Sequence, residues 1–124
     1  MFTHVMIGSN DLERSRNFYD ATFAALGGKP GGMDARGRLI YAHDGGRLMI
    51  TKPIDGNPAT AANGGTIGIV AADRDQVLAW HQAGTTHGGT AIEGTPGERP
   101  NGSFAAYLRD PDGNKLTARC PATK

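Results

Sequence analysis

The stretch Asp112-Gly-Asn-Lys-Leu-Thr-Ala-Arg-Cys-Pro121 repeats an earlier one, Asp44-Gly-Gly-Arg-Leu-Met-Ile-Thr-Lys-Pro53. Both follow one frame, in which Asp-Gly, a variable residue, a basic residue and leucine precede four variable residues and a proline. An Asp-Gly turn followed by an apolar run is typical of the second strand of a β-hairpin. The repetition therefore predicts equivalent strands in two copies of one structural unit.

The repeat extends upstream of each hairpin. Residues 4–11 and 66–73 are apolar runs of equal length that end at an aspartate. Each is followed by a helical pattern that stops at paired glycines, Gly27-Gly28 and Gly88-Gly89. We therefore expect each unit to run βαβββ, with the early third strand the hardest to locate. The alternative is that these similarities arise without duplication, because glycine and aspartate are common at the turns of many folds.

Local signals place the elements within this frame. Asn10 with Glu13 predicts a capping box before the first helix, and Asp73 with Gln76 predicts another before the second. Apolar residues then recur at helical spacing, at Leu12, Tyr19, Phe23 and Leu26 and at Val77, Trp80 and Gly84. Residues 38–43 and 47–52 are expected to pair as a hairpin, as are residues 103–109 and 115–120. The prediction is one α+β domain over residues 1–124, with module one at about 1–53, a linker at about 54–65 and module two at about 66–124.

Composition limits the classes of function. Hydrophobic residues make up 38% and charged residues 20% of the chain, which is typical of a globular protein. The formal net charge is +1 and the basic residues are scattered, so the sequence predicts no basic surface for binding nucleic acid or an anionic membrane. No apolar run is long enough to span a bilayer, and no signal-peptide pattern opens the chain. With Cys120 as the single cysteine, no internal disulfide is possible, and we expect a cytoplasmic protein.

Two phrases carry a family resemblance. They are His4-Val-Met-Ile-Gly-Ser-Asn-Asp-Leu-Glu-Arg-Ser-Arg-Asn-Phe-Tyr19 and Ala106-Tyr-Leu-Arg-Asp-Pro-Asp-Gly-Asn-Lys-Leu116. Together they resemble the vicinal oxygen chelate superfamily, which includes glyoxalase I, extradiol dioxygenases, and the fosfomycin and bleomycin resistance proteins. The resemblance implies two βαβββ modules whose curved sheets form a U-shaped cleft. It also implies a homodimer, in which the cleft is built within one chain or from strands of two chains.

The resemblance also locates the metal ligands of the superfamily's enzymes. The repeat maps their four symmetric strand positions onto His4, Met49, Thr66 and Thr117. Only His4 is a good ligand, because a thioether is too soft for Mg²⁺, Mn²⁺ or Fe²⁺ and threonine hydroxyls are weak neutral donors. Metal catalysis needs about three protein ligands and an open position. We therefore expect no cofactor and no divalent metal at these positions, and a metal at a displaced site is the disfavoured alternative.

The expected ligand-binding residues are His4, Met49, Thr66, Tyr107 and Thr117. His4 is the one candidate for catalysis, as a general acid or base, although a histidine that only forms a structural hydrogen bond explains it equally well. The first hypothesis is a protein that binds a small organic molecule without a metal. The second is a glyoxalase-like lyase or dioxygenase-type enzyme that uses a displaced metal site or His4. The third is an interaction module whose cleft is filled by its own side chains.

Four other residues receive simpler interpretations. His43, beside the hairpin turn, is expected to be solvated, and His87 to favour a helix C-terminus. Cys120 lacks a visible base and is interpreted as a packed or surface thiol. Arg99 lies in a loop over residues 93–102, where a solvated surface arginine is the favoured interpretation and a clamp for an anionic ligand is the alternative.

Overall fold

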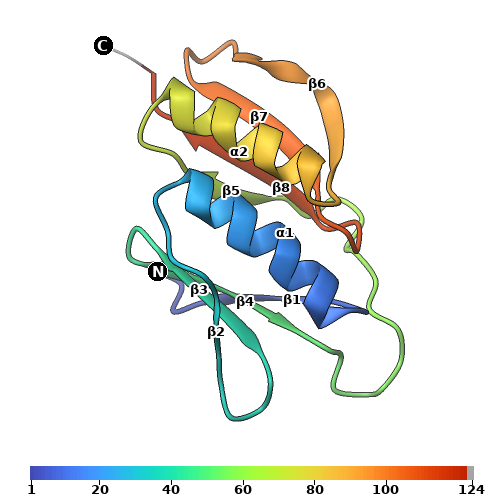
Figure 1. Ribbon diagram of the computed structural model, residues 1–124. Coiled ribbons are helices and arrows are strands. Elements are labelled where there is room, and N and C mark those ends of the chain that lie inside the picture. The colour runs from blue at the N-terminus through green and yellow to red at the C-terminus, as the bar shows by residue number, and fades with distance from the viewer. Residues whose placement is uncertain (123–124) are drawn as a thin grey trace.

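The computed structural model describes residues 1–122, in which two helices and eight strands form two modules (Figure 1). Module one contains β1 (Val5–Gly8), α1 (Leu12–Ala25), β2 (Gly32–Met33), β3 (Leu39–His43) and β4 (Gly46–Thr51). Module two contains β5 (Ile67–Val70), α2 (Arg74–Thr86), β6 (Thr90–Glu98), β7 (Phe104–Arg109) and β8 (Lys115–Cys120). The order βαβββ in both modules confirms the predicted fold class.

Each module arranges its strands in one mixed four-stranded sheet, in the orders β1-β4-β3-β2 and β5-β8-β7-β6. The first strand of each module lies parallel to its last strand. Val5 pairs with Leu48 in module one, and Ile67 pairs with Leu116 in module two. The leucine of the repeated sequence frame therefore pairs with the equivalent position of the first strand in both sheets, which confirms that the repeat is structural.

The predicted start of α1 is wrong by one residue. The N-cap is Asp11, whose side chain accepts a hydrogen bond from the backbone N–H of Arg14. Asn10 instead bonds the chain between the modules, because its Oδ1 accepts from the N–H of Ala59 and its Nδ2 donates to the Ala59 carbonyl. The predicted cap at Asp73 is confirmed, because its side chain accepts from the backbone N–H of Gln76. The return bond of the capping box is displaced by one residue, since Gln76 Oε1 accepts from the N–H of Ala72 rather than of Asp73.

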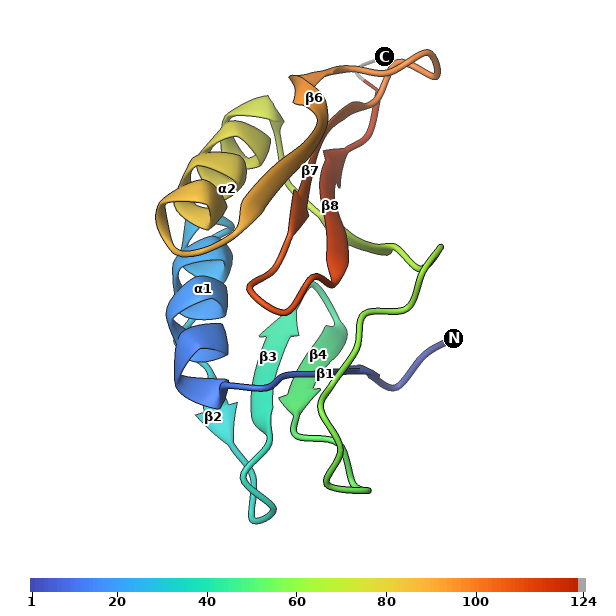
Figure 2. The same cartoon turned by 90° about the vertical axis from the view of Figure 1, so that its right-hand side faces the viewer.

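Both helices lie on the same side of the two sheets and pack against each other (Figure 2). They meet closely at Gly84 of α2, where a Cβ atom would lie 2.2 Å from Leu108 Cδ1 and 3.3 Å from the ring of Phe18. The largest buried side chains gather between helices and sheets, and they include Trp80, Tyr19, Phe18, Leu39, Ile50, Leu108 and Leu116. Cys120 is part of this core, so its interpretation as a packed thiol is confirmed.

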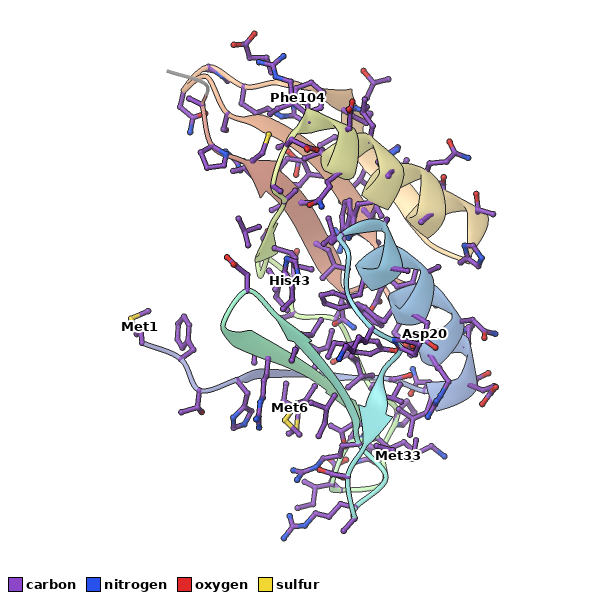
Figure 3. The ribbon with its side chains drawn as sticks, turned by 60° about the vertical axis from the view of Figure 1, so that its left-hand side comes forward. Met1, Met6, Asp20, Met33, His43 and Phe104 are labelled. Atoms are coloured by element: carbon purple, nitrogen blue, oxygen red, sulfur yellow. The ribbon has the colours of Figure 1, made fainter. Side chains whose placement is uncertain are left out.

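Within residues 1–122 the other face of each sheet carries no helix, and we call it the open face. Strand alternation assigns residues to it. In β7 Leu108 packs toward α2, so its neighbour Tyr107 lies on the open face together with its cross-strand partner Thr117. In module one, Figure 3 shows Met6 on the side of β1 that faces away from the helices. Met49, the partner of Met6 in β4, lies on that same face.

The turn between β7 and β8 joins the two modules. Asp112 in this turn accepts hydrogen bonds from the N–H of Asn10 at 2.9 Å, from Arg14 Nη2 at 3.1 Å and from Ser15 Oγ at 3.2 Å. Its carboxylate therefore lies at the N-terminus of α1, where the helix dipole favours a negative charge. Among residues 1–122, no helix is both long enough and apolar enough to cross a membrane.

Candidate functional site

The open face of module two centres on a cross-strand pair, Thr117 and Tyr107. Thr117 is only 6% exposed, and its hydroxyl donates to the Ala106 carbonyl at 2.9 Å. On the other side of Thr117 lies Gly68 of β5, where a Cβ atom would come 3.7 Å from Thr117 Cγ2. Gly68 has no side chain to contact Thr117 on this side, and Thr117 is nonetheless buried.

Three cationic side chains surround the ring of Tyr107. Arg119 Nη2 donates to the Tyr107 hydroxyl at 2.9 Å. The guanidinium carbon of Arg99 lies 5.2 Å from the ring centroid, and Lys115 Nζ lies 5.3 Å from it. We call Arg99, Lys115 and Arg119 the cationic cluster. Arg99 is half-buried, so the favoured interpretation as an ordinary solvated arginine is wrong.

The predicted residues of module one lie on the first sheet. His4 immediately precedes β1 and is exposed, with its Nδ1 2.9 Å from Thr3 Oγ1. Met49 lies in β4, is 8% exposed and pairs with Met6. His4 stands two residues before Met6, just as the exposed Thr66 stands two residues before Gly68 in module two. The two halves of the predicted site are thus equivalent, but they lie on separate sheets.

A cavity of about 440 Å³ lies where the β3–β4 hairpin and the N-terminal residues approach β5. Its walls are mainly apolar, and its lining includes Phe23, Tyr41, Leu48, Ile67 and Ile69. Of the five predicted binding residues, His4 lines this cavity, whereas Met49, Thr66, Tyr107 and Thr117 do not. Gly68 also lines it, and Gly68 is the cross-strand neighbour of Thr117.

His43 lines this cavity and is a candidate ligand contact that the sequence interpretation missed. Its side chain lies between the β3–β4 hairpin and module two (Figure 3), and Nε2 donates to the Val70 carbonyl at 2.7 Å. Its ring centroid lies 5.9 Å from that of Phe23. It is half-buried, so the prediction of a solvated histidine is wrong. The alternation of Leu39 and Tyr41 on the buried face of β3 is the signal that could have placed it there.

The polar end of Tyr41 is not available to a ligand. Its hydroxyl donates to Asp20 Oδ1 at 2.6 Å. Burial, followed by this hydrogen bond and the charge of Asp20, raises the pKa of Tyr41 far above its ordinary value. Tyr41 therefore stays neutral and contributes its ring to the cavity wall.

The residues at the four symmetric positions do not fit a divalent metal. They offer one imidazole, one thioether and two hydroxyls, and the Thr117 hydroxyl already donates to Ala106. Such a set lacks the anionic oxygens and multiple imidazoles that these ions prefer. Within the described part of the chain, no three His, Cys, Asp or Glu side chains gather as a potential metal site.

Comparisons with known proteins agree with the fold. A glyoxalase/bleomycin resistance protein from Albidiferax ferrireducens T118 is 48% identical, with a TM-score of 0.92 and 98% of each chain covered. A lactoylglutathione lyase from Agrobacterium tumefaciens is 21% identical, with a TM-score of 0.68, and the match covers 97% of this chain and 92% of the lyase. Fosfomycin resistance protein FosX from Mesorhizobium loti is 15% identical, with a TM-score of 0.69, and the match covers 98% of this chain and 92% of FosX.

A search among curated proteins found no match. A family profile described as the Glyoxalase/Bleomycin resistance protein/Dioxygenase superfamily matches residues 1–117. This match spans nearly the whole chain, and the structural relative at 48% identity is described as a glyoxalase/bleomycin resistance protein. The chain therefore belongs to the glyoxalase/bleomycin resistance protein/dioxygenase superfamily.

Proposed function

We propose that the protein binds a small organic molecule in the cleft of this fold, without the usual divalent metal. The observation that carries the proposal is the cavity of about 440 Å³ at the module junction. Its size and its apolar walls with a few polar groups are typical of small-molecule sites. His4 and His43 supply hydrogen-bonding groups at its edge.

The remaining predicted residues are proposed to flank this cavity. Thr117 is the cross-strand neighbour of Gly68, which lines the cavity, and Tyr107 is the next residue across the sheet. Thr66 precedes the β5 strand that lines the cavity, and Met49 lies on the open face of module one. A ligand larger than the cavity would extend over these side chains.

A metal-free site is proposed from the chemistry of the donors. His4 alone among the four symmetric positions offers a good ligand, and one neutral imidazole holds a divalent ion weakly. The same positions suit contacts with an organic molecule, because Met49 and the Thr117 methyl group are apolar.

We also propose that the protein forms a homodimer. β1 and β5 are edge strands of separate sheets, and the two modules are joined through α1 and α2 rather than by strand pairing. Free edges favour pairing with another chain. A second copy that covered these edges would bring the two halves of the site together. Neither nucleic acid nor membrane is an expected partner, and a cytoplasmic location stays a prediction.

A second candidate is a glyoxalase-like lyase or a dioxygenase-type enzyme. Two imidazoles, from His4 and His43, line one cavity, and this observation favours proton-transfer chemistry there. His4 would act as the acid or base, because the Nε2 hydrogen of His43 is held by Val70. A metal bound at a displaced site is the other route to such an activity.

The proposal is tested with an uncharged dye, N-phenyl-1-naphthylamine, whose fluorescence rises in apolar sites. We expect saturable binding that Val70→Gln weakens, since Val70 is 41% exposed and lines the cavity. Leu78→Gln is the matched control, because Leu78 is 46% exposed but lies on α2 away from the cavity. Equal dye affinity in both variants would contradict this location. Elemental analysis that found about one divalent ion per chain, with dye binding lost on chelation, would contradict a metal-free site.

A further inference from the structure

We propose that the ligand is an organic anion, and that its acidic group binds the cationic cluster of Arg99, Lys115 and Arg119 around Tyr107. The chemical class is a small molecule with a carboxylate, sulfonate, phosphonate or phosphate group and an apolar body. The inference rests on the proposed function, because it assigns the chemistry of the molecule that occupies the same face.

The three cations of the cluster converge on one phenol ring. Arg119 is held at the ring's polar end by its bond to the Tyr107 hydroxyl, and its Nη1 donates to Ser103 Oγ at 2.8 Å. Arg99 and Lys115 both lie close to the ring, where its electron-rich face attracts cations. The aromatic ring thus keeps like charges together that would otherwise separate.

The carboxylates near the cluster do not neutralise its positive charge. Glu93 forms an ion pair with Lys115. In residues 1–122 no carboxylate forms an ion pair with Arg99 or Arg119. The side chain of Arg99 donates to the Ala105 carbonyl, and that of Arg119 donates to the hydroxyls of Ser103 and Tyr107. Two guanidinium groups with neutral partners leave a local positive potential on an otherwise nearly neutral chain. An anion bound between them would form charge-assisted hydrogen bonds with both.

Arg99 has one hydrogen-bond donor, its Nε–H, that has no partner among the described residues. Its Nη2 donates to the Ala105 carbonyl at 3.1 Å, but its Nε–H is shielded from solvent. Shielded donors in proteins nearly always have a partner. Rotation of the Arg99 guanidinium toward an anion would therefore gain a bond at Nε without losing one there.

The cluster is within reach of the cavity. Gly68, Thr117 and Tyr107 are neighbours across three adjacent strands, and Gly68 lines the cavity. Two strand spacings correspond to about 10 Å. A molecule of this length can place its acidic group at Arg99 and Arg119, its body along the exposed Gly68, and its far end in the cavity.

The test compares two dyes with the same aromatic skeleton, the anionic 1-anilinonaphthalene-8-sulfonate and the uncharged N-phenyl-1-naphthylamine. We expect Arg119→Gln and Arg99→Gln each to weaken sulfonate binding by about tenfold, with neutral-dye binding changed less than about twofold. Arg36→Gln is the control, because it removes the same charge from an exposed arginine outside the cluster.

A second measurement uses the wild-type protein and does not depend on the folding of a variant. The Nε–H signal of Arg99 in a nitrogen–proton spectrum should shift when the sulfonate dye is added and stay in place with the neutral dye. An unshifted signal, or sulfonate affinity that is equal in the wild type and both cluster variants, overturns the anion assignment. If the anion assignment is overturned but the neutral dye still binds, the proposed function stands without an anionic ligand. If neither dye binds, both the proposed function and the anion assignment fail.

Discussion

The hydroxyl of Tyr19 on α1 donates a hydrogen bond to Asp110 Oδ2 in the β7–β8 turn, at 2.5 Å. Both residues are buried, and they come from the two phrases that carry the family resemblance. The Asp110 carboxylate also accepts from the N–H groups of Asp112 and Asn114 and from Asn114 Nδ2. The two phrases therefore meet at the contact between the modules, and this pair serves the architecture rather than ligand binding.

Removal of the Tyr19 hydroxyl should destabilise the protein. In Tyr19→Phe the Asp110 carboxylate keeps its turn donors but loses its donor from the other module. A hydrogen bond to a charged group contributes about 1.5–3 kcal/mol, so we expect a loss of that size in the free energy of unfolding. Urea unfolding measures it. Tyr107→Phe is the control, since Tyr107 is half-buried and bonds Arg119 instead, and it should cost less. Equal losses in the two variants would refute the special role of Tyr19.

The same residue predicts a loss of stability in alkaline solution. Burial, then the charge and hydrogen bond of Asp110, raises the pKa of Tyr19 well above its ordinary value of about 10. Because the folded pKa is the higher one, the unfolded chain releases this proton first as the pH rises. The stabilisation is therefore complete below about pH 10 and declines above it. Urea unfolding between about pH 8 and 11 should show a steeper decline for the wild type than for Tyr19→Phe, and parallel curves would contradict the prediction.

Helix packing predicts an unfavourable effect of alanine at Gly84. Alanine favours a helix over glycine by about 1 kcal/mol. A Cβ at Gly84, however, would lie 2.2 Å from Leu108 Cδ1, with Phe18 and Thr22 at 3.3 and 3.4 Å. Overpacking costs about 1–3 kcal/mol, so we expect a net loss in the free energy of unfolding. Thr85→Ala, at the exposed neighbour in the same helix, should be neutral or slightly stabilising. A gain in stability in Gly84→Ala would show that Leu108 can move aside.

Closing the path between cavity and cluster should weaken binding without unfolding the protein. In Gly68→Val the added Cβ atom would lie at an ordinary contact distance of 3.7 Å from Thr117 Cγ2, and the two methyl groups of valine would occupy the exposed position that Gly68 leaves open. We expect the affinity for the sulfonate dye to fall by about fivefold or more, which corresponds to roughly 1 kcal/mol. Gly32→Val is the matched control, because it adds the same side chain to the exposed strand β2 with no neighbour within 4 Å. Equal affinities in the two variants would argue against this path.

His4 should matter for binding whether or not the protein is an enzyme. His4→Ala removes a polar group from the cavity edge, and we expect a loss of about 1 kcal/mol, or roughly fivefold in neutral-dye affinity. His87→Ala is the control, since the ring of His87 is exposed and its Nδ1 donates to the Ala83 carbonyl in its own helix. This contact also confirms the helix C-terminal position predicted for His87. Once a substrate is known, unchanged turnover in His4→Ala would remove His4 from any mechanism.

Much of the fold could be predicted because its signals are local. The repeated frame around Leu48 and Leu116 marks equivalent strands, and the Asp-Gly turns, the cap at Asp73 and the apolar spacing of α1 depend on near neighbours in the chain. Backbone sterics and the burial of one face act over a few residues. The absence of a good ligand at Thr117 is likewise a property of residue type, which no packing changes.

Only the tertiary structure decided which residues meet across the chain. Asn10 has the chemistry of a helix cap, but Ala59 competes for its side chain, and Asp11 becomes the cap. His43 and Arg99 have polar side chains, which lose hydration when they are buried, so the sequence alone favoured the surface for both. Their positions follow from contacts with Val70 and Tyr107, which depend on how the hairpins and loops pack. The sequence by itself thus determined the repeat and the donors at its symmetric positions, and the packing of distant segments decided the cavity and the cationic cluster.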